Sequence, residues 1–239
     1  MTADEKQGKR LAFLGALAGG LAHEIKNPLS TISMNLQLLN EDWSAPETGK
    51  VESERERRLV RKLGILAKEV HRLEEILDDF LRFAGGQRLT RESAQVSEVL
   101  KEVLEFLGPK FVQSRVELRA MLDEDLPLVV IDRNAMKQVF INLLVNAVQA
   151  MPNGGELMVR SRLHEDDVVV EVTDTGEGIP EELMEKIWQI YYSRRRTGTG
   201  MGLPTARRIV EELDGSISVV SEKGKGTRFT LRLPVEAIG

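Results

Sequence analysis

The amino-acid sequence predicts an α+β protein made of a long helical hairpin followed by an α/β sandwich. Apolar residues repeat in alternating steps of three and four within residues 5–84, which is typical of helices that pack along one seam. From residue 96 onwards, helical and strand-like segments mix without strict βαβ alternation. That mixture favours a sandwich over a Rossmann-type sheet.

The first predicted helix covers about residues 5–40. Pro28 interrupts its apolar register, as a proline inside a helix does. At about 100° per residue, His23 points away from the seam residues Leu21 and Ile25, so it is not expected to be a core histidine. The seam of this helix consists of Leu11, Leu14, Ala18, Leu21, Ile25, Ile32, Leu36 and Leu39.

Residues 41–50 are predicted to form a loop, and a second helix runs from there to about Ala84. Its seam consists of Leu59, Leu63, Leu66, Val70, Leu73, Leu77, Phe80 and Ala84. Two such helices form a hairpin whose seam is exposed on one side, so we expect two chains to form a four-helix bundle; an antiparallel coiled-coil stalk would show the same pattern. Gly85-Gly86 follows as a hinge, which predicts domains at 1–86 and 87–239.

Composition narrows the function classes. The net charge of the 239 residues is −5, from 33 basic and 38 acidic side chains, which gives no support to a nucleic-acid partner. Cysteine is absent, which excludes disulfides and thiolate metal sites. The uncharged run at residues 11–22 is well short of the ~20 residues that span a bilayer. We therefore expect a soluble, cytoplasmic chain without membrane contact.

The second half is predicted to alternate between helices and short strands. The helices are expected at Val96–Leu107 (stopped by Gly108-Pro109), Asn134–Met151, Glu181–Ile190 and Pro204–Leu213, and the strands at Val116–Leu122, Leu128–Ile131, Glu156–Leu163, Val168–Thr173, Ser216–Ser221 and Thr227–Leu233.

Four motifs in this half suggest phosphate and cation chemistry. Asn142 and Asn146 share one helix face, and amide oxygens suit a hard cation such as Mg²⁺; two exposed asparagines are the alternative. The glycines of DTGEGIP (174–180) let a ligand approach the backbone closely, and those of GTGMGLP (198–204) leave N–H groups free before a helix. Each motif alone is also an ordinary turn. GKGTRF (224–229) alone is a hairpin turn.

In this order, and after a hairpin that carries a histidine, the motifs resemble the catalytic core of the sensor histidine kinases of two-component systems. HEIKNPL is similar to the phosphoacceptor box, NLLVNAVQAM to the N box, DTGEGIP and GTGMGL to the glycine boxes, and IWQIYYSRRR to the phenylalanine box. The resemblance covers essentially the whole chain, and NAVQAMPNGG is similar to the subgroup that contains nitrogen-regulation sensors.

The resemblance implies a role for each matching residue of the hairpin. His23 would be the phosphorylated nucleophile, and Glu24 would hold or deprotonate its other ring nitrogen. Glu24 and Asn27 would also place a water for dephosphorylating the partner.

The resemblance likewise implies an ATP site with Mg²⁺. Asn142 and Asn146 would hold the metal, Asp174 would accept from the adenine amine, and Thr227 would assist near the base. The remaining residues implied at the nucleotide are Gly176, Gly178, Ile179, Tyr192, Arg195, Gly198, Thr199, Gly200, Met201, Gly202 and Leu203. Trp188, Tyr191 and Tyr192 stand where phenylalanines are usual, and Ile190 replaces a proline, which bears on the packing of a lid.

The implied protein is an ATP-dependent histidine kinase and a homodimer, with the receiver domain of a response regulator as partner. A non-catalytic dimeric scaffold and an ATPase of the GHKL type (gyrase and heat-shock chaperone) are the alternatives. Since only about ten residues precede the first seam residue, Leu11, we expect a catalytic fragment or an input that arrives through a partner.

Overall fold

The protein divides into two compact units in the computed structural model. They comprise Met1–Gly86 with Ser193–Met201, and Gln87–Tyr192 with Gly202–Gly239. The residues that the structure describes are 25–39, 57–70, 73, 77, 89–193 and 200–235. No helix within these ranges is long and apolar enough to cross a membrane.

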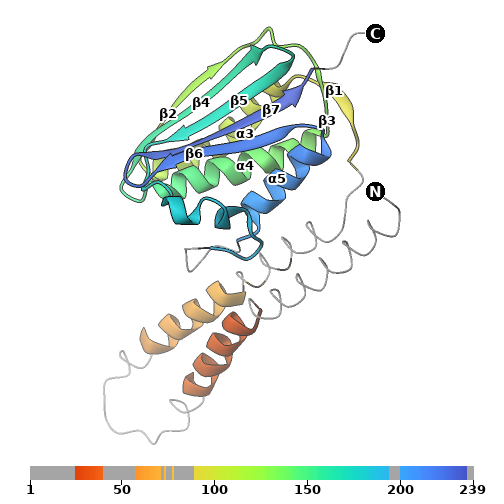
Figure 1. Ribbon diagram of the computed structural model, residues 1–239. Helices are drawn as coiled ribbons and strands as arrows, with labels where there is room; N and C mark the ends of the chain where they lie inside the picture. Colours follow the sequence, from red (N-terminus) through yellow and green to blue (C-terminus); the bar gives the residue numbers. More distant parts are fainter. Residues whose placement is uncertain are drawn as a thin grey trace, which may run out of the picture. The chain divides into compact units, whose positions relative to one another are not determined.

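Within the described part of the first unit, helices cover residues 25–39 and 57–70 (Figure 1). The two helices lie side by side, and Lys62 Nζ on the second donates to the carbonyl oxygen of Leu38 on the first at 3.1 Å. Burial departs from the predicted seam of the first helix: Asn35 is buried, whereas Leu36 is 52% exposed. Asn35 tolerates burial because its Nδ2 donates to the carbonyl oxygen of Thr31 at 2.9 Å.

Much of the predicted seam of the second helix is uncovered within one chain. Leu63 is 51% exposed, and Leu59, Val70 and Leu77 are also exposed. The predicted hinge at Gly85-Gly86 lies outside the described residues.

The second unit is built on a five-stranded sheet in the order β2-β4-β5-β7-β6 (Figure 1). β2 pairs with β4 in parallel, and the other neighbours are antiparallel. The strands are β2 Val116–Leu122, β4 Gly155–His164, β5 Asp167–Asp174, β6 Ser216–Glu222 and β7 Gly226–Pro234. A small sheet of β1 Glu92–Ala94 and β3 Val129–Ile131 completes the unit, and of these β1 is not among the predicted strands.

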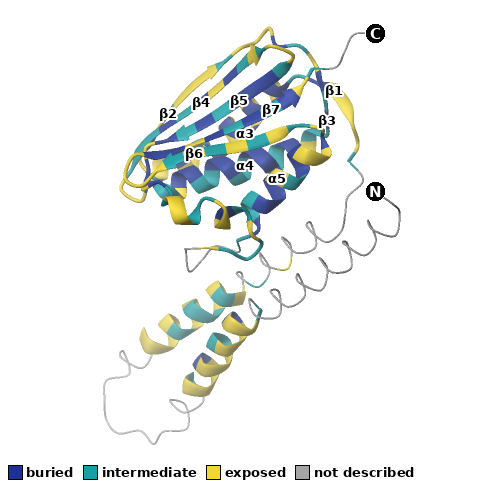
Figure 2. Cartoon of the chain, viewed as in Figure 1, coloured by how far each residue is buried: buried dark blue, intermediate teal, exposed yellow. Residues whose placement is uncertain are grey.

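Three helices cover one face of the five-stranded sheet and bury the core between the two layers (Figure 2). They are α3 Val96–Gln113, α4 Arg133–Ala150 and α5 Gly202–Glu212. α4 is central: its buried residues recur at helical spacing from Met136 to Ala147 and include the fully buried Phe140 and Leu144. Its first turn is capped by Asp132, whose Oδ1 accepts from Ala135 N at 3.0 Å. The predicted α+β class is confirmed.

α3 continues past the Gly108-Pro109 stop that the sequence predicts. Pro109 lies inside the helix, which ends at Gln113, before Arg115 adopts a φ of 55°. A proline removes one intrahelical hydrogen bond. The apolar stripe outweighs this loss, because Phe111, one turn beyond Leu107, is 3% exposed in the core.

The helix predicted at Glu181–Ile190 is instead two short 3₁₀ turns, η1 Glu181–Leu183 and η2 Lys186–Trp188. Their hydrogen bonds run from residue i to i−3, as from Gln189 N to Lys186 O at 2.9 Å. Only Ile187 is buried in these two turns, so too little apolar surface faces the core to hold a full helix.

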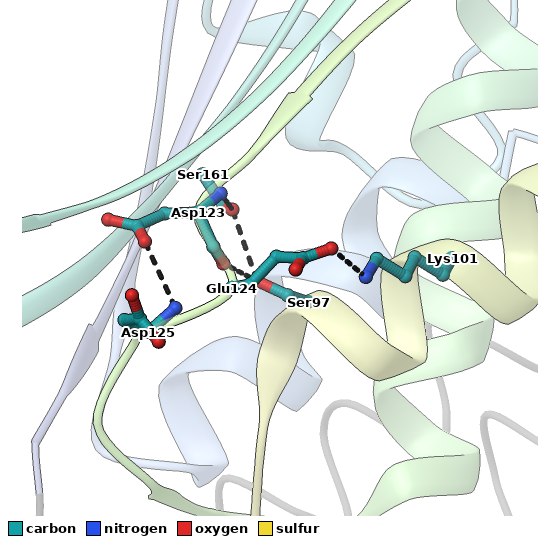
Figure 3. Close-up of polar contacts among 6 residues, drawn as sticks. All are labelled: Ser97, Lys101, Asp123, Glu124, Asp125 and Ser161. Atoms are coloured by element: carbon teal, nitrogen blue, oxygen red, sulfur yellow. Dashed lines mark hydrogen bonds and ion pairs between the residues drawn. The ribbon is translucent and has the colours of Figure 1, made fainter.

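A buried hydroxyl pair fastens the loop after β2 (Figure 3). Ser97 Oγ on α3 donates to the carbonyl oxygen of Asp123 at 2.5 Å, and Ser161 Oγ on β4 accepts from Asp123 N at 3.1 Å. On the surface above, Lys101 pairs with Glu124 at 2.6 Å. Its hydrogen bond lowers the pKa of the Glu124 carboxyl. The loop is thereby tied to both layers of the sandwich.

An ion-pair network braces α3 against α4. Glu102 on α3 accepts from Arg133 at 2.7 Å and from Lys137 at 2.5 Å, and Arg133 also reaches Glu98 at 3.0 Å. The hydrogen bonds from Lys137 and Arg133 lower the pKa of Glu102, and those from Arg133 to Glu98 and Glu102 raise the pKa of the guanidinium.

Replacing Glu102 by glutamine is expected to lower the melting temperature modestly at neutral pH and not at low pH. A carboxylate with a lowered folded pKa stabilises the protein above the ordinary glutamate pKa of about 4.3. This contribution to stability is lost as the pH falls through the pKa that Glu102 has in the folded protein. The measurement is the melting temperature of wild type and variant between neutral pH and about pH 3. Glu105→Gln, on an exposed site of the same helix, is the matched control; an E102Q effect that does not change with pH would contradict the assignment.

Candidate functional site

Three polar side chains lie in one row across three adjacent strands of the second unit. Asp174 at the end of β5 is the register partner of Thr227 on β7, which in turn pairs with Ser221 on β6. Asp174 is 4% exposed and Thr227 5%. Both continue the sheet face that packs on the helices, because Val172 and Phe229, two residues away on the same face, belong to the core. A buried carboxylate beside a buried hydroxyl is an unusual feature for the edge of a core and suits ligand recognition.

The DTGEGIP loop is held between α4 and the β6–β7 hairpin. Asp174 Oδ1 accepts from Gly176 N at 2.8 Å, and Glu177 N donates to the carbonyl oxygen of Ala150 at 3.0 Å. A Cβ at Gly176 would lie 2.6 Å from that same carbonyl oxygen, so only glycine fits there. Gly178 has a φ of 65° and leaves no room for a Cβ beside the backbone of Glu222.

Ile179 ends this loop and ties it to the strand row. Its backbone N–H donates to Ser221 Oγ at 2.8 Å, and its side chain packs partly buried against the core. The glycine loop and the row therefore form one connected unit.

The two asparagines of α4 lie one turn apart and are both half-buried. Asn142 Nδ2 donates to the carbonyl oxygen of Gly202 at 3.0 Å, which ties α4 to the start of α5. Because the nitrogen of this amide is engaged as a donor, its oxygen remains as the acceptor of the side chain. Mg²⁺ binds oxygen ligands, and the Oδ1 atoms of Asn142 and Asn146 are of this kind, so these residues fit such an ion.

The second glycine motif leads into the N-terminus of α5. Gly200 has a φ of 68°, Met201 is buried, and Leu203 packs partly buried against the core. An 11-residue helix beginning at Gly202 has N–H groups and a dipole that favour an anion at this end. Arg195, Gly198 and Thr199 lie outside the described residues.

Trp188 anchors the aromatic segment between the two glycine motifs. Its ring meets Phe229 edge-on, with centroids 6.1 Å apart at 88°, and Arg207 of α5 stands 5.4 Å above it. Tyr192 is half-buried, and its N–H donates to the carbonyl oxygen of Gln189 at 3.2 Å.

In the first unit, Asn27 is an exposed residue of the helix at 25–39, and its carbonyl oxygen accepts from Thr31 Oγ1 at 3.3 Å. His23 and Glu24 lie outside the described residues.

Ser221 is the residue of this site that the motifs miss. A signal is present in SISVVSE, because Ile217, Val219 and Ser221 share one face of β6, and a hydroxyl there breaks an apolar pattern. The motif boundaries stop short of this strand, so nothing in them points to Ser221.

A mixed sheet covered on one face by helices, with a buried acid, glycine loops and a helix N-terminus at one end, defines a nucleotide-binding class of α/β sandwich. Two family models match the chain in order. The His Kinase A (phospho-acceptor) domain matches residues 13–88, and the histidine kinase-, DNA gyrase B- and HSP90-like ATPase matches residues 131–237.

Known proteins similar to this chain are named as kinases. Sporulation kinase E of Bacillus subtilis is 33% identical over 96% of this chain and 30% of its own length, and sporulation kinase C of the same organism is 32% identical over 97% and 51%. The crystal structure of histidine kinase ThkA in complex with response regulator protein TrrA aligns with a TM-score of 0.77 at 28% identity, over 98% of this chain and 65% of that one.

The chain belongs to the sensor histidine kinases of two-component systems. It spans between 30 and 51% of the length of the two curated relatives named above.

Proposed function

We propose that this protein is an ATP-dependent histidine kinase that phosphorylates His23 and passes the phosphoryl group to an aspartate of a response regulator. Residues 1–86 would serve dimerisation and phosphotransfer, and residues 87–239 would bind the nucleotide. The observation that carries the proposal is the pairing of Asp174 with Thr227, next to a loop in which neither Gly176 nor Gly178 has room for a Cβ.

Adenine would lie against this row. The Asp174 carboxylate accepts from the exocyclic amine, Thr227 contacts the base beside it, and Gly176 and Gly178 allow the ring to approach the backbone. Ile179, Leu203 and Tyr192 would contribute apolar and aromatic contacts, and the N-terminus of α5 would meet the phosphates together with Arg195 and the glycines of 198–202.

Mg²⁺ would be held by Asn142 and Asn146 through their amide oxygens, together with phosphate oxygens and water. When bound, the ion would neutralise the charge of the phosphates during transfer. Asn142 has a second task, because its bond to Gly202 holds the start of α5 in place.

In the transfer step, an imidazole nitrogen of His23 would attack the γ-phosphorus of ATP. The bond from phosphorus to the bridging oxygen breaks, ADP leaves with that electron pair, and Glu24 accepts or shares the proton on the other ring nitrogen. The aspartate of the receiver domain would then attack the phosphohistidine and free the imidazole. In a separate phosphatase reaction, Glu24 and Asn27 would place the water that attacks the aspartyl phosphate of the partner and releases inorganic phosphate.

The exposed stripe of Leu59, Leu63, Val70 and Leu77 supports a homodimer. An uncovered apolar seam on a helical hairpin is stabilised when a second copy covers it, which gives a four-helix bundle. The partner is proposed to be a receiver domain, in keeping with the ThkA structure, whose title names a response regulator.

Incubation with γ-labelled ATP and Mg²⁺ tests the proposal. We expect an acid-labile, alkali-stable label on wild type, because phosphohistidine carries a P–N bond, and its complete loss in His23→Ala. His164→Ala, at the far end of β4, is the matched histidine control and should keep the label. Free phosphate without protein label would favour the GHKL-type ATPase, and neither product would favour the scaffold.

A further inference from the structure

We propose that Ser221 sets the choice of adenine over 6-oxopurines by fixing the direction of the Thr227 hydroxyl. This inference rests on the proposed nucleotide function of the same site. Ser221 is then a positioning residue, because it acts through Thr227.

The hydrogen atoms around Ser221 can be assigned. Ser221 Oγ lies 2.8 Å from the carbonyl oxygen of Gly226, which can only accept, so the Ser221 proton points there. Ile179 N–H donates to Ser221 Oγ at 2.8 Å. In the remaining contact, 2.9 Å between Ser221 Oγ and Thr227 Oγ1, the available proton is that of Thr227. Thr227 therefore donates to Ser221 and presents lone pairs on its other side.

The row consequently offers acceptors to a base. Asp174 is a carboxylate whose Oδ1 already holds Gly176 N, and Thr227 next to it is an acceptor because its proton is used by Ser221. A purine with a 6-amino group supplies N–H donors to such a pair, directly or through water. A purine with a 6-carbonyl places its C6 oxygen, an acceptor, against these acceptors and keeps N1–H as the donor on that edge, which leaves a buried acceptor without a partner at C6.

A purely mechanical role for Ser221 is the competing explanation. Its bond to Ile179 N also holds the glycine loop, so loss of the hydroxyl could weaken every nucleotide equally. The two explanations differ in one measurable quantity, the ratio of affinities for ADP and inosine diphosphate, because inosine differs from adenosine in its carbonyl at C6 and its N1–H.

The experiment measures dissociation constants of ADP and inosine diphosphate for the full chain by calorimetry. We expect wild type to favour ADP by about 100-fold or more. Ser221→Ala should reduce that ratio by about tenfold, because the freed Thr227 proton can turn toward a carbonyl. Ser221→Thr keeps the hydroxyl and should restore the wild-type ratio. Ser218→Ala, an exposed serine on the opposite face of β6, is the matched control and should leave both constants unchanged.

Thr227→Val and the double variant with Ser221→Ala complete the test. If Ser221 acts through Thr227, the valine variant reduces the ratio, and adding Ser221→Ala reduces it no further. An equal loss of affinity for both nucleotides in Ser221→Ala, or an unchanged ratio in Thr227→Val, overturns the inference even if one variant folds poorly. Failure of wild type to bind either nucleotide would instead overturn the proposed function itself.

Discussion

Replacing Asp174 by asparagine is expected to weaken ATP binding by about 100-fold while leaving the fold intact. The asparagine oxygen can still accept from Gly176 N, as Asp174 Oδ1 does at 2.8 Å, so the loop keeps its anchor. The second carboxylate oxygen becomes an NH₂ group, which opposes the amine of adenine donor against donor. The variant loses one charge-assisted hydrogen bond, worth roughly 1.5–3 kcal/mol, and gains that repulsion.

Calorimetric titration with ADP and a thermal melt of each variant check this result. Asp167→Asn is the matched control on the same strand, because Asp167 lies at its other end and contacts Arg232 at 3.6 Å. It should leave nucleotide affinity unchanged. Normal affinity of the Asp174→Asn protein would mean that the carboxylate is not part of the nucleotide site. A melting temperature far below that of wild type would mean that Asp174 has a structural role.

The regular elements of the second unit could be predicted where apolar residues recur at the period of the helix or strand. β2 has the predicted bounds, Val116–Leu122, and α4 differs from the prediction by one residue at each end. Both have an apolar pattern whose period matches its structure, so local preference and packing agree.

The errors occur where packing overrides a local signal. Pro109 predicts a helix end, but Phe111 still has a core position to fill, so α3 continues. The acidic segment after Pro180 looks helical, but η1 and η2 bury only Ile187 and stay as single 3₁₀ turns. Neither outcome can be known before the partner surfaces are known.

The candidate site shows the same division. Glycine motifs and their order predict that a nucleotide loop exists, because the chemistry is encoded in consecutive residues. The row of Asp174, Thr227 and Ser221 is encoded in strand register, which joins positions 53 and 6 residues apart in the chain. Register depends on the whole sheet, so Ser221 becomes visible only in the folded protein.

Replacing Gly226 by alanine is expected to destabilise the second unit by roughly 3 kcal/mol or more and to abolish nucleotide binding. Gly226 begins β7 with a φ of 104°, and a Cβ there would lie far inside van der Waals distance of the Asp174 carbonyl oxygen. Because the obstacle is backbone, no side chain can rotate away. β7 must move from the end of β5, which separates Thr227 from Asp174.

Gly224→Ala isolates this close approach from backbone strain. Gly224 lies in the same turn with a φ of 81°, but a Cβ there meets nothing within 4 Å. Its substitution therefore costs only the left-handed conformation, about 1–2 kcal/mol, and should leave ADP affinity unchanged. Thermal melts with and without ADP separate the two variants: ADP should raise the melting temperature of Gly224→Ala and not that of Gly226→Ala. Equal behaviour of the two variants would mean that glycine is needed for the backbone conformation of the turn and not for the close contact between β5 and β7. The row would then tolerate displacement of its strands.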